Sequence, residues 1–525
     1  MSLTPFFQKI LPRVAVAFLA AALVVSCETS KAGDTATGRE SAAAADASVE
    51  RVVLQAYRII GDRYIYNPDF PRLAAETYRG FASPDSRLTL VTTGNSFTVL
   101  DEGRQILSRP VPSEANDGRA WGSMLAELFE ASTAASPTLR ATDRQLLIKQ
   151  ALTATTKQLD RNSRYADPDE ARDNRFQRDG GGGIGITVER TDDGKIWIRN
   201  VQDASPAAKA GLQAGDQIVM IDDQVMGDRP LSEVIQRLRG AIGAPLALSV
   251  LRRTPDRQIN VALKRARIIP TTVTYERQGD IAVIRLLSFN TATTDMLRQA
   301  VDKARSDIGP QLAGIILDMR DNRGGLLDQA LTVTEEFVGD GMVFATQGRH
   351  PDSRRTYVSE SGRKAVEVPM VTLVNGMSAS AAEIVAAALQ DRGRAAVVGT
   401  TSYGKGTVQT VMRLPNEGEL ILTWSRLMAP SGYTWNELGV LPNVCTAKVA
   451  NPQKLGPDAA DANHSTLMHW HAERNPTPDQ VSHLRQICPP GEGSADRDLA
   501  IATHLLQDRE LYALAVRSGT DQASR

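Results

Sequence analysis

Two short segments of the chain carry residue types that could cooperate in nucleophilic catalysis. A serine-rich turn, Ser378-Ala379-Ser380-Ala381-Ala382-Glu383, joins a predicted strand to a predicted helix. A serine there would stand at a helix N-terminus, where backbone N–H groups favour developing negative charge. The second segment, Gly404-Lys405-Gly406-Thr407-Val408-Gln409, offers a lysine whose amine, if buried, could accept the serine proton. The pattern predicts a serine nucleophile with a lysine base.

Each segment also has an alternative interpretation. Ser380 and Glu383 form an S-x-x-E capping box, which would explain both residues without any chemistry. Gly399–Lys405 matches the start of a phosphate-binding G-x-x-x-x-G-K loop. However, Gly406 stands where serine or threonine would contact Mg²⁺, and a strand rather than a helix is predicted to follow. The sequence therefore disfavours nucleotide binding and leaves the capping box open.

Further backbone and side-chain groups could assist such a pair. If a strand runs on from Lys405, Gln409 projects to the same side, and its amide could hold the lysine amine. A third segment, LDMRDNRGGLLDQA, places Gly324 and Gly325 in a strand–turn–helix where glycines expose their N–H groups. The alternative for this segment is an ordinary turn capped by Asn322.

The elements around these segments predict a multidomain α+β chain. From about residue 268, strands and helices alternate, which implies helices packed on a largely parallel sheet. A mainly β unit precedes it, after the glycine run Gly180–Gly183, and a mostly helical region with a strand pair near Leu88–Leu107 comes earlier still. The predicted divisions are 1–27 signal peptide and lipobox, 28–48 flexible tether, 49–178 helical region, 179–267 β unit, 268–452 catalytic core and 453–525 C-terminal extension. The extension reads as polar and irregular, with one helix around Leu499–Val516.

Bulk composition excludes some function classes. The chain has 525 residues, too many for one hydrophobic core, and its apolar (42%) and charged (23%) contents are those of a soluble globular protein. The net charge of −1 and the even spread of charges provide no field that would attract nucleic acid. Nucleic-acid binding is therefore not expected.

The N-terminus resembles a bacterial lipoprotein signal. Lys9 and Arg13 precede the apolar run Val14–Val25, which is short for a membrane span and typical of a signal-peptide core. Small residues lead to Cys27, which the resemblance makes the lipidated first residue of the mature protein. Glu28, in place of aspartate, then favours the outer membrane of a Gram-negative bacterium. The alternative is an ordinary signal peptide with an incidental cysteine.

The remaining cysteines and the histidines do not indicate a metal site. With Cys27 as an anchor, Cys445 and Cys488 remain, and an exported pair can form a disulfide or stay as two thiols. Neither has the C-x-x-C spacing of a zinc site. His464, His469 and His471 lie in a polar segment and are expected on the surface.

The segment 378–410 resembles the active-site region of carboxyl-terminal processing (tail-specific) proteases. Their pattern is S-A-S-A-S-E followed by G-K-G-T-V-Q, and here Ala382 replaces the third serine. The resemblance implies that Ser380 is the nucleophile, that Lys405 is its base and that Gln409 assists. It also implies an oxyanion hole made by the N–H of Ala381 with that of Gly324 or Gly325.

The β unit resembles the PDZ domains of bacterial proteases through the segment ASPAAKAGLQAGDQIVMIDDQ. In such domains a loop binds a peptide's terminal carboxylate, and an open strand edge pairs with its backbone. By resemblance that loop is Gly183, Ile184, Gly185 and Ile186. A PDZ fold used only as a spacer is the alternative. The resemblance to the protease family extends over about residues 155–445 and does not explain 49–150 or the tail.

The sequence thus predicts a serine endopeptidase of the cell envelope that recognises substrate C-termini in the periplasm. No metal or organic cofactor is expected, and the expected partners are peptides with free C-termini and the membrane, with an adaptor or a homo-oligomer left open. Two rivals differ in class. One is an inactive PDZ scaffold or adaptor, which the intact Ser380, Lys405 and Gln409 argue against. The other is a hydrolase of a different acyl bond.

Overall fold

The fold is taken from a computed structural model that describes residues 47–253, 256–360, 367–449, 451–458, 464–472 and 476–517. Cys27, the apolar run before it and the predicted tether up to residue 46 lie outside these residues. Within the described ranges, no helix is both long enough and apolar enough to cross a membrane.

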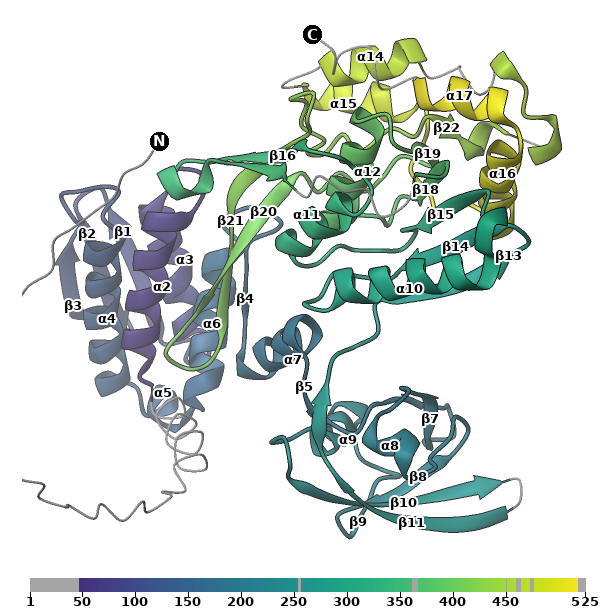
Figure 1. Cartoon of the computed structure of the whole chain (residues 1–525). Coiled ribbons are helices and arrows are strands. Elements are labelled where there is room, and N and C mark those ends of the chain that lie inside the picture. Colours follow the sequence, from purple (N-terminus) through teal and green to yellow (C-terminus); the bar gives the residue numbers. More distant parts are fainter. Residues whose placement is uncertain are drawn as a thin grey trace, which may run out of the picture. The chain divides into compact units, whose positions relative to one another are not determined.

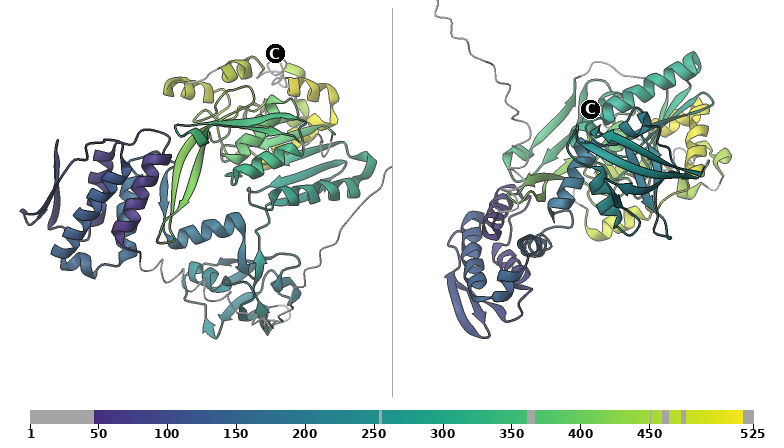
Figure 2. Two further views of the ribbon diagram at one scale, coloured as in Figure 1. Left: turned by 60° about the vertical axis from the view of Figure 1, so that its left-hand side comes forward. Right: turned by 90° about the horizontal axis from the view of Figure 1, so that it is seen from below.

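The N-terminal region is a helical layer beside a small sheet (Figures 1 and 2). The helices of the layer are α2 (Val49–Arg63), α3 (Phe70–Ala82), α4 (Gly118–Ala135), α5 (Pro137–Ala141) and α6 (Arg144–Thr156), and α7 (Pro168–Asp179) lies apart from them (Figure 1). Several begin at a side chain that accepts a backbone N–H, such as Asp69 and Asp117. Buried aromatic rings fill the core, with Phe81 stacked on Phe129 at 3.9 Å between ring centres.

The small sheet has three strands where the sequence predicted two. Its strands are β1 (Leu88–Thr93), β2 (Ser96–Asp101) and β3 (Arg104–Pro110), paired antiparallel in chain order. Glu102 and Gly103 both have positive φ, 48° and 82°, and make the tight turn into β3. The third strand escaped prediction because it is half-exposed and its polar residues blur the period-two pattern.

A β-hairpin of the catalytic region is also part of the N-terminal core. Strands β20 (Thr407–Arg413) and β21 (Glu419–Met428) form it, in a sheet with β16 (Gly341–Gln347) and β17 (Arg355–Ser359). The far end of the hairpin packs Leu414, Leu420 and Leu422 among the aromatic residues of the helices. The short strand β4 (Arg164–Ala166) pairs with β21. The N-terminal region is thereby joined to the strand that follows Lys405.

The β unit is a small sheet with its own core. Its strands are β6 (Ile186–Arg190), β7 (Ile196–Val201), β8 (Gln217–Ile221), β9 (Gln224–Val225), β10 (Pro245–Arg253) and β11 (Asp256–Lys264), with α8 (Pro206–Lys209) and α9 (Leu231–Leu238). The order β11-β10-β8-β7-β6 leaves β6 paired on one side only. Strands β5 (Gly181–Gly183) and β12 (Ala266–Ile268) pair with each other at its boundary.

The catalytic sheet has the order β13-β14-β15-β18-β19-β22 and is parallel except for its first pair. Its strands are β13 (Val273–Gln278), β14 (Ile281–Leu286), β15 (Gly314–Asp318), β18 (Met370–Val374), β19 (Ala396–Gly399) and β22 (Val444–Cys445). On one face, Ile315, Leu317 and Val397 join the core that includes residues of α10 (Thr293–Ile308), α11 (Leu327–Glu335) and α12 (Ala381–Asp391). The predicted α+β class is confirmed.

The C-terminal extension is more ordered than predicted, and its last two helices cover the opposite face of this sheet (Figure 1). It contains α14 (His464–Ala472), α15 (Pro478–Arg485), α16 (Ala495–Gln507) and α17 (Arg509–Arg517), where one helix was expected. Ile501 and Leu505 pack against Ile316 and Leu373. The helix expected around Leu499–Val516 corresponds to α16 and α17, which Asp508 separates, whereas the short helices α14 and α15 were missed.

A disulfide links the extension to the core, between Cys445 at the end of β22 and Cys488. The two cysteines are 43 residues apart. Closing a loop of that length in the unfolded chain favours the folded state by about 4 kcal/mol in the chain-entropy account.

The expectation that His471 lies on the surface is wrong. Its side chain is buried, its ring stacks on Tyr433 at 4.2 Å, and its Nδ1 lies 3.5 Å from the Asp391 Oδ1 atom. Burial lowers the pKa of this imidazole, and Asp391 acts in the opposite direction. His469, by contrast, is exposed as expected.

Candidate active site

The nucleophile turn, residues 375–380, joins the buried strand β18 to α12, a helix buried along its whole length. Ser380 is the last residue before this helix and has φ 57° and ψ −114°. Such a backbone conformation costs a non-glycine residue about 1–3 kcal/mol, and strain of this kind gathers at functional sites. The sequence predicted both the strand-to-helix turn and the place of Ser380 in it.

The two serines of the turn have different surroundings. Ser378 is fully buried, and its Oγ accepts the N–H of Asn375 (2.9 Å) and donates to the Met319 carbonyl (2.8 Å). Ser380 is only partly buried, its Oγ accepts the Glu383 N–H in the capping box at the start of α12, and no hydrogen bond donated by its hydroxyl is found within the described residues. Ser378 therefore shapes the turn, and the Ser380 hydroxyl is the one free to react.

Lys405 lies between two glycines that permit a close backbone approach. A Cβ on Gly404 would come within 2.9 Å of the Glu437 backbone, and one on Gly406 within 2.4 Å of the Asn436 nitrogen. Burial lowers the pKa of the Lys405 ammonium below its ordinary value of 10.5, and the nearby Glu383 carboxylate acts against this shift. A lysine with a lowered pKa is the kind of base that a serine nucleophile needs.

Glu383 connects the nucleophile turn to the Lys405 loop, residues 400–406. Its Oε2 accepts the N–H of Ser380 (2.8 Å) and of Lys405 (2.9 Å). Its Oε1 accepts the N–H of Gly404 (2.7 Å) and the hydroxyl of Ser402. The side chain is fully buried, and burial raises the pKa of the carboxyl while the four donors oppose that shift.

Glu383 therefore has two roles, of which the capping box with Ser380 is only one. The carboxylate does bind the Ser380 N–H, as a cap would, but it also binds two N–H groups more than twenty residues further along the chain. The cap and the site are thus compatible. Sequence reasoning assigned Glu383 to a cap because nothing in a local motif indicates such distant partners.

We expect Glu383→Gln to lower kcat by about 10²-fold while KM changes little, because misplacing a catalytic group by about 1 Å has an effect of that size. The amide keeps the shape but replaces one acceptor oxygen by a donor, which faces N–H groups. Steady-state kinetics with a peptide substrate measures the change. A variant with unchanged kcat would show that Glu383 does not position the two loops.

The oxyanion turn, residues 318–325, lies directly against the nucleophile turn. A Cβ on Gly324 would come within 2.8 Å of the Ser380 Cβ atom. The Gly324 N–H is already used, because it donates to Asn322 Oδ1 at 2.8 Å. No hydrogen bond from the N–H of Gly325, or from that of Ala381 at the first position of α12, is found in the described part of the chain. Gly325 and Ala381 are therefore the better pair of candidate donors.

In the part of the chain that the structure describes, no hydrogen bond joins the Gln409 side chain to the Lys405 amine, which the strand pattern had suggested. Strand β20 begins at Thr407, after Lys405, and the pairing register shifts between Val408 and Gln409. The amide instead donates to the Oγ1 atoms of Thr407 (2.9 Å) and Thr423 (3.4 Å). The bulge interrupts the period-two alternation on which the expectation depended.

The structure brings Ser380, Lys405 and the two candidate donors to one place, but the side chains of Ser380 and Lys405 are not joined directly. Within the described residues, no hydrogen bond links the side chains of Ser380 and Lys405. The segment after Gly406 is the strand β20, so the helix that a phosphate-binding loop requires is absent here.

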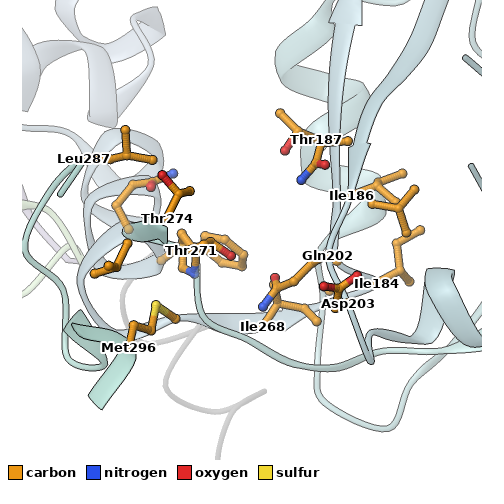
Figure 3. A pocket seen from close by; sticks show the side chains of 18 of the residues that line it. Ile184, Ile186, Thr187, Gln202, Asp203, Ile268, Thr271, Thr274, Leu287 and Met296 are labelled. Atoms are coloured by element: carbon orange, nitrogen blue, oxygen red, sulfur yellow. The ribbon is translucent and has the colours of Figure 1, made fainter. Parts of the chain in front are cut away.

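The predicted carboxylate-binding loop lines a cavity of about 1010 Å³ (Figure 3). Gly183, Ile184, Gly185 and Ile186 lie along it, together with residues of β6, β13 and α10. Figure 3 shows Ile184, Ile186 and Thr187 on one side of the space and Thr274 and Leu287 on the other. The unpaired edge of β6 belongs to this cavity, so an extended peptide could add to the sheet there.

Comparison with known proteins identifies the class. The sequence profile of peptidase family S41 matches residues 280–446, and that of the PDZ domain matches residues 182–263. A carboxy-terminal-processing protease of Bartonella bacilliformis is 38% identical over 304 residues, which cover 58% of this chain and 70% of that protein. The chain therefore belongs to the carboxy-terminal-processing protease family, serine-type peptidases of family S41, and carries a PDZ domain.

Other relatives are less similar in sequence. A probable CtpA-like serine protease of Staphylococcus haemolyticus is 30% identical over 312 residues, covering 58% of this chain and 61% of that protein. Among solved structures, a photosystem II D1 C-terminal processing protease has a TM-score of 0.37 at 22% identity and covers 75% of this chain and 92% of that chain. The resemblance drawn from the sequence motifs is confirmed by the family match.

Proposed function

We propose that the protein hydrolyses peptide bonds through an acyl-enzyme on Ser380, with Lys405 as the base. The observation that carries this proposal is the Glu383 carboxylate, which holds the strained Ser380 backbone and the Lys405 backbone on the same side-chain group. A nucleophile and a base that are fixed to one buried anchor lose little freedom in reaching each other.

The proposed reaction uses groups of this chain alone. Neutral Lys405 takes the proton of the Ser380 hydroxyl as its oxygen attacks the substrate carbonyl. The N–H groups of Gly325 and Ala381 bind the oxyanion of the tetrahedral intermediate. The lysine ammonium then protonates the leaving amine, and water releases the acyl group by the reverse sequence. Gln409 assists in this proposal by fixing Thr407 and Thr423, next to the Lys405 loop.

The proposed substrates are proteins and peptides with a free, apolar C-terminus that the PDZ domain binds. The support is the free edge of β6 together with the apolar side chains Ile184 and Ile186 along the cavity. Backbone pairing would provide affinity there, and the apolar pocket would select the last side chain.

A matched pair of peptides tests this substrate preference. We expect a peptide with a free, apolar C-terminus to be cleaved at least about tenfold faster at low concentration than its amidated twin, because only the free carboxylate can be bound by the loop. Deleting residues 183–252 should remove the difference between the two, whichever way overall activity moves. Equal cleavage of both peptides by the intact enzyme would contradict the preference and leave the chemistry of Ser380 untouched.

The proposed compartment is the periplasmic side of the cell envelope, with anchoring by a lipid on Cys27. The Cys445–Cys488 disulfide supports this, because disulfides persist in oxidising compartments. We expect wild-type protein to sediment with membranes, and Cys27→Ser to lose the lipid mass and to enter the soluble fraction. Intact mass and fractionation that do not change after Cys27→Ser would contradict the anchor.

A further inference from the structure

One segment of the C-terminal extension contacts all three loops of the proposed catalytic centre, namely the nucleophile turn, the Lys405 loop and the oxyanion turn. It comprises residues 485–498, between α15 and the start of α16, and is called the brace below. It lies beyond residue 446, where the match to the S41 profile ends. The contacts that follow are made by backbone carbonyls and by one buried carboxylate.

The first contact is with the Lys405 loop. The Thr401 hydroxyl donates to the Cys488 carbonyl at 2.5 Å, and the Thr400 hydroxyl donates to the Gly491 carbonyl at 2.9 Å. Both threonines are buried, so each hydroxyl depends on the brace for its acceptor.

The second contact is with the nucleophile turn. The Gly376 N–H donates to the Gly491 carbonyl at 2.8 Å, and Asn375 Nδ2 donates to the Glu492 carbonyl at 3.0 Å. The approach is close, because a Cβ on Gly376 would come within 2.9 Å of the Gly491 nitrogen. The Gly491 carbonyl is therefore shared by the nucleophile turn and the Lys405 loop.

The third contact is with the oxyanion turn. Arg320 binds Asp318 through Nε (2.9 Å) and Nη2 (2.7 Å), donates to the Ala495 carbonyl at 2.9 Å and approaches Asp498 Oδ2 at 3.4 Å. Asp498 is fully buried. A buried ion pair of this kind fixes the geometry of both partners, because breaking it would leave an uncompensated charge.

The disulfide holds the brace against these loops. Cys445 ends the strand β22, which pairs with β19 in the catalytic sheet, and Cys488 supplies one of the carbonyls that the Lys405 loop binds. The cross-link thus fixes the acceptor residue to the same sheet that carries the loops. Without the disulfide, Cys488 would be linked to Cys445 only through the 43 residues of chain that separate them.

We propose that the brace is a positioning element of catalysis and that the Cys445–Cys488 disulfide locks it, so that turnover depends on the oxidation state of this pair. This proposal rests on the function proposed above. A dithiol reductant supplies two electrons and two protons, the S–S bond breaks to two thiols, and the reductant becomes a disulfide. The released brace then holds the nucleophile turn and the Lys405 loop less firmly.

The test compares oxidised and dithiothreitol-reduced full-length protein by amide hydrogen exchange and by peptide kinetics. We expect reduction to speed exchange in residues 375–381 and 400–406 and to lower kcat about tenfold or more, with KM and peptide affinity unchanged. Reoxidation should restore both readouts. A Cys445→Ser/Cys488→Ser double variant should resemble the reduced protein, and the reductant should change neither its kcat nor its exchange rates.

A second pair of variants keeps the disulfide and tests the contacts themselves. Thr400→Val/Thr401→Val removes the two hydroxyls that bind the brace, and we expect the same loss of kcat in oxidised protein. The matched control is Thr372→Val, which removes a buried hydroxyl that has no hydrogen-bond partner among the described residues and should leave kcat unchanged.

The outcomes separate the brace from the function on which it rests. Folded, reduced protein with unchanged exchange in both loops and unchanged kcat would overturn the brace. If reduction unfolds the protein, the Thr400→Val/Thr401→Val variant provides the test instead. An unchanged kcat in that variant would also overturn the proposed role of the brace. Oxidised protein without any peptidase activity would refute the proposed function, and the exchange comparison would still decide whether the brace holds the loops.

Discussion

Replacing Ser380 with alanine is expected to lower kcat/KM for peptide hydrolysis by at least about 10³-fold, because no acyl-enzyme can form without the hydroxyl. The fold should persist, since the bond from the residue-380 N–H to Glu383 is made by the backbone and survives the change. Steady-state kinetics with a C-terminally free peptide, together with a thermal melt, measures both parts.

Ser378→Ala is the matched control for that variant, two residues away in the same turn. Its hydroxyl bridges the Met319 carbonyl and the Asn375 N–H, so its loss should destabilise the fold by about 1–3 kcal/mol while leaving substantial activity. An inactive Ser378→Ala beside an active Ser380→Ala would move the nucleophile to Ser378.

Lys405→Met is the second large effect, and we expect it to abolish turnover to a similar extent while raising the melting temperature at neutral pH. Methionine keeps much of the volume of the side chain but has no amine to accept the serine proton. Burial disfavours the charged lysine, so its removal relieves an unfavourable contribution to the folded state. Activity retained in Lys405→Met would exclude this residue as the base.

The pH dependence of the wild-type enzyme has a definite sign. Because the base must be neutral, kcat/KM should rise with pH as Lys405 loses its proton. The midpoint of this rise should lie at a pH below the ordinary lysine pKa of 10.5. With a folded-state pKa below the unfolded one, the unfolded chain binds more protons in that window, so the contribution of Lys405 to stability also rises with pH. Activity that falls over the same window would contradict the assignment.

The sequence was sufficient where function depends on local pattern. Three features are properties of short segments: the turn with Ser380, the glycines beside Lys405, and the nearly continuous apolar runs that form β15, β18 and β19. Such short patterns can be recognised in the sequence without knowledge of tertiary contacts. They predicted the strand–helix alternation and the residues that the site brings together.

The sequence was insufficient where function depends on distant partners. Glu383 binds the N–H groups of Gly404 and Lys405, which lie more than twenty residues away, and no motif encodes that pairing. His471 is buried because it stacks on Tyr433 of another segment, and the local sequence does not show that contact. The brace escaped notice for the same reason, since its contacts are made by backbone carbonyls, which every residue type carries.

The most direct test of the central claim is to label the full-length protein with a serine-reactive fluorophosphonate and to locate the adduct by peptide mass spectrometry. The account predicts one adduct, on Ser380, that forms faster as pH rises toward 10.5 and is almost lost in Lys405→Met. An adduct on Ser378 or on another residue, or no adduct on protein that cleaves peptides, would contradict it.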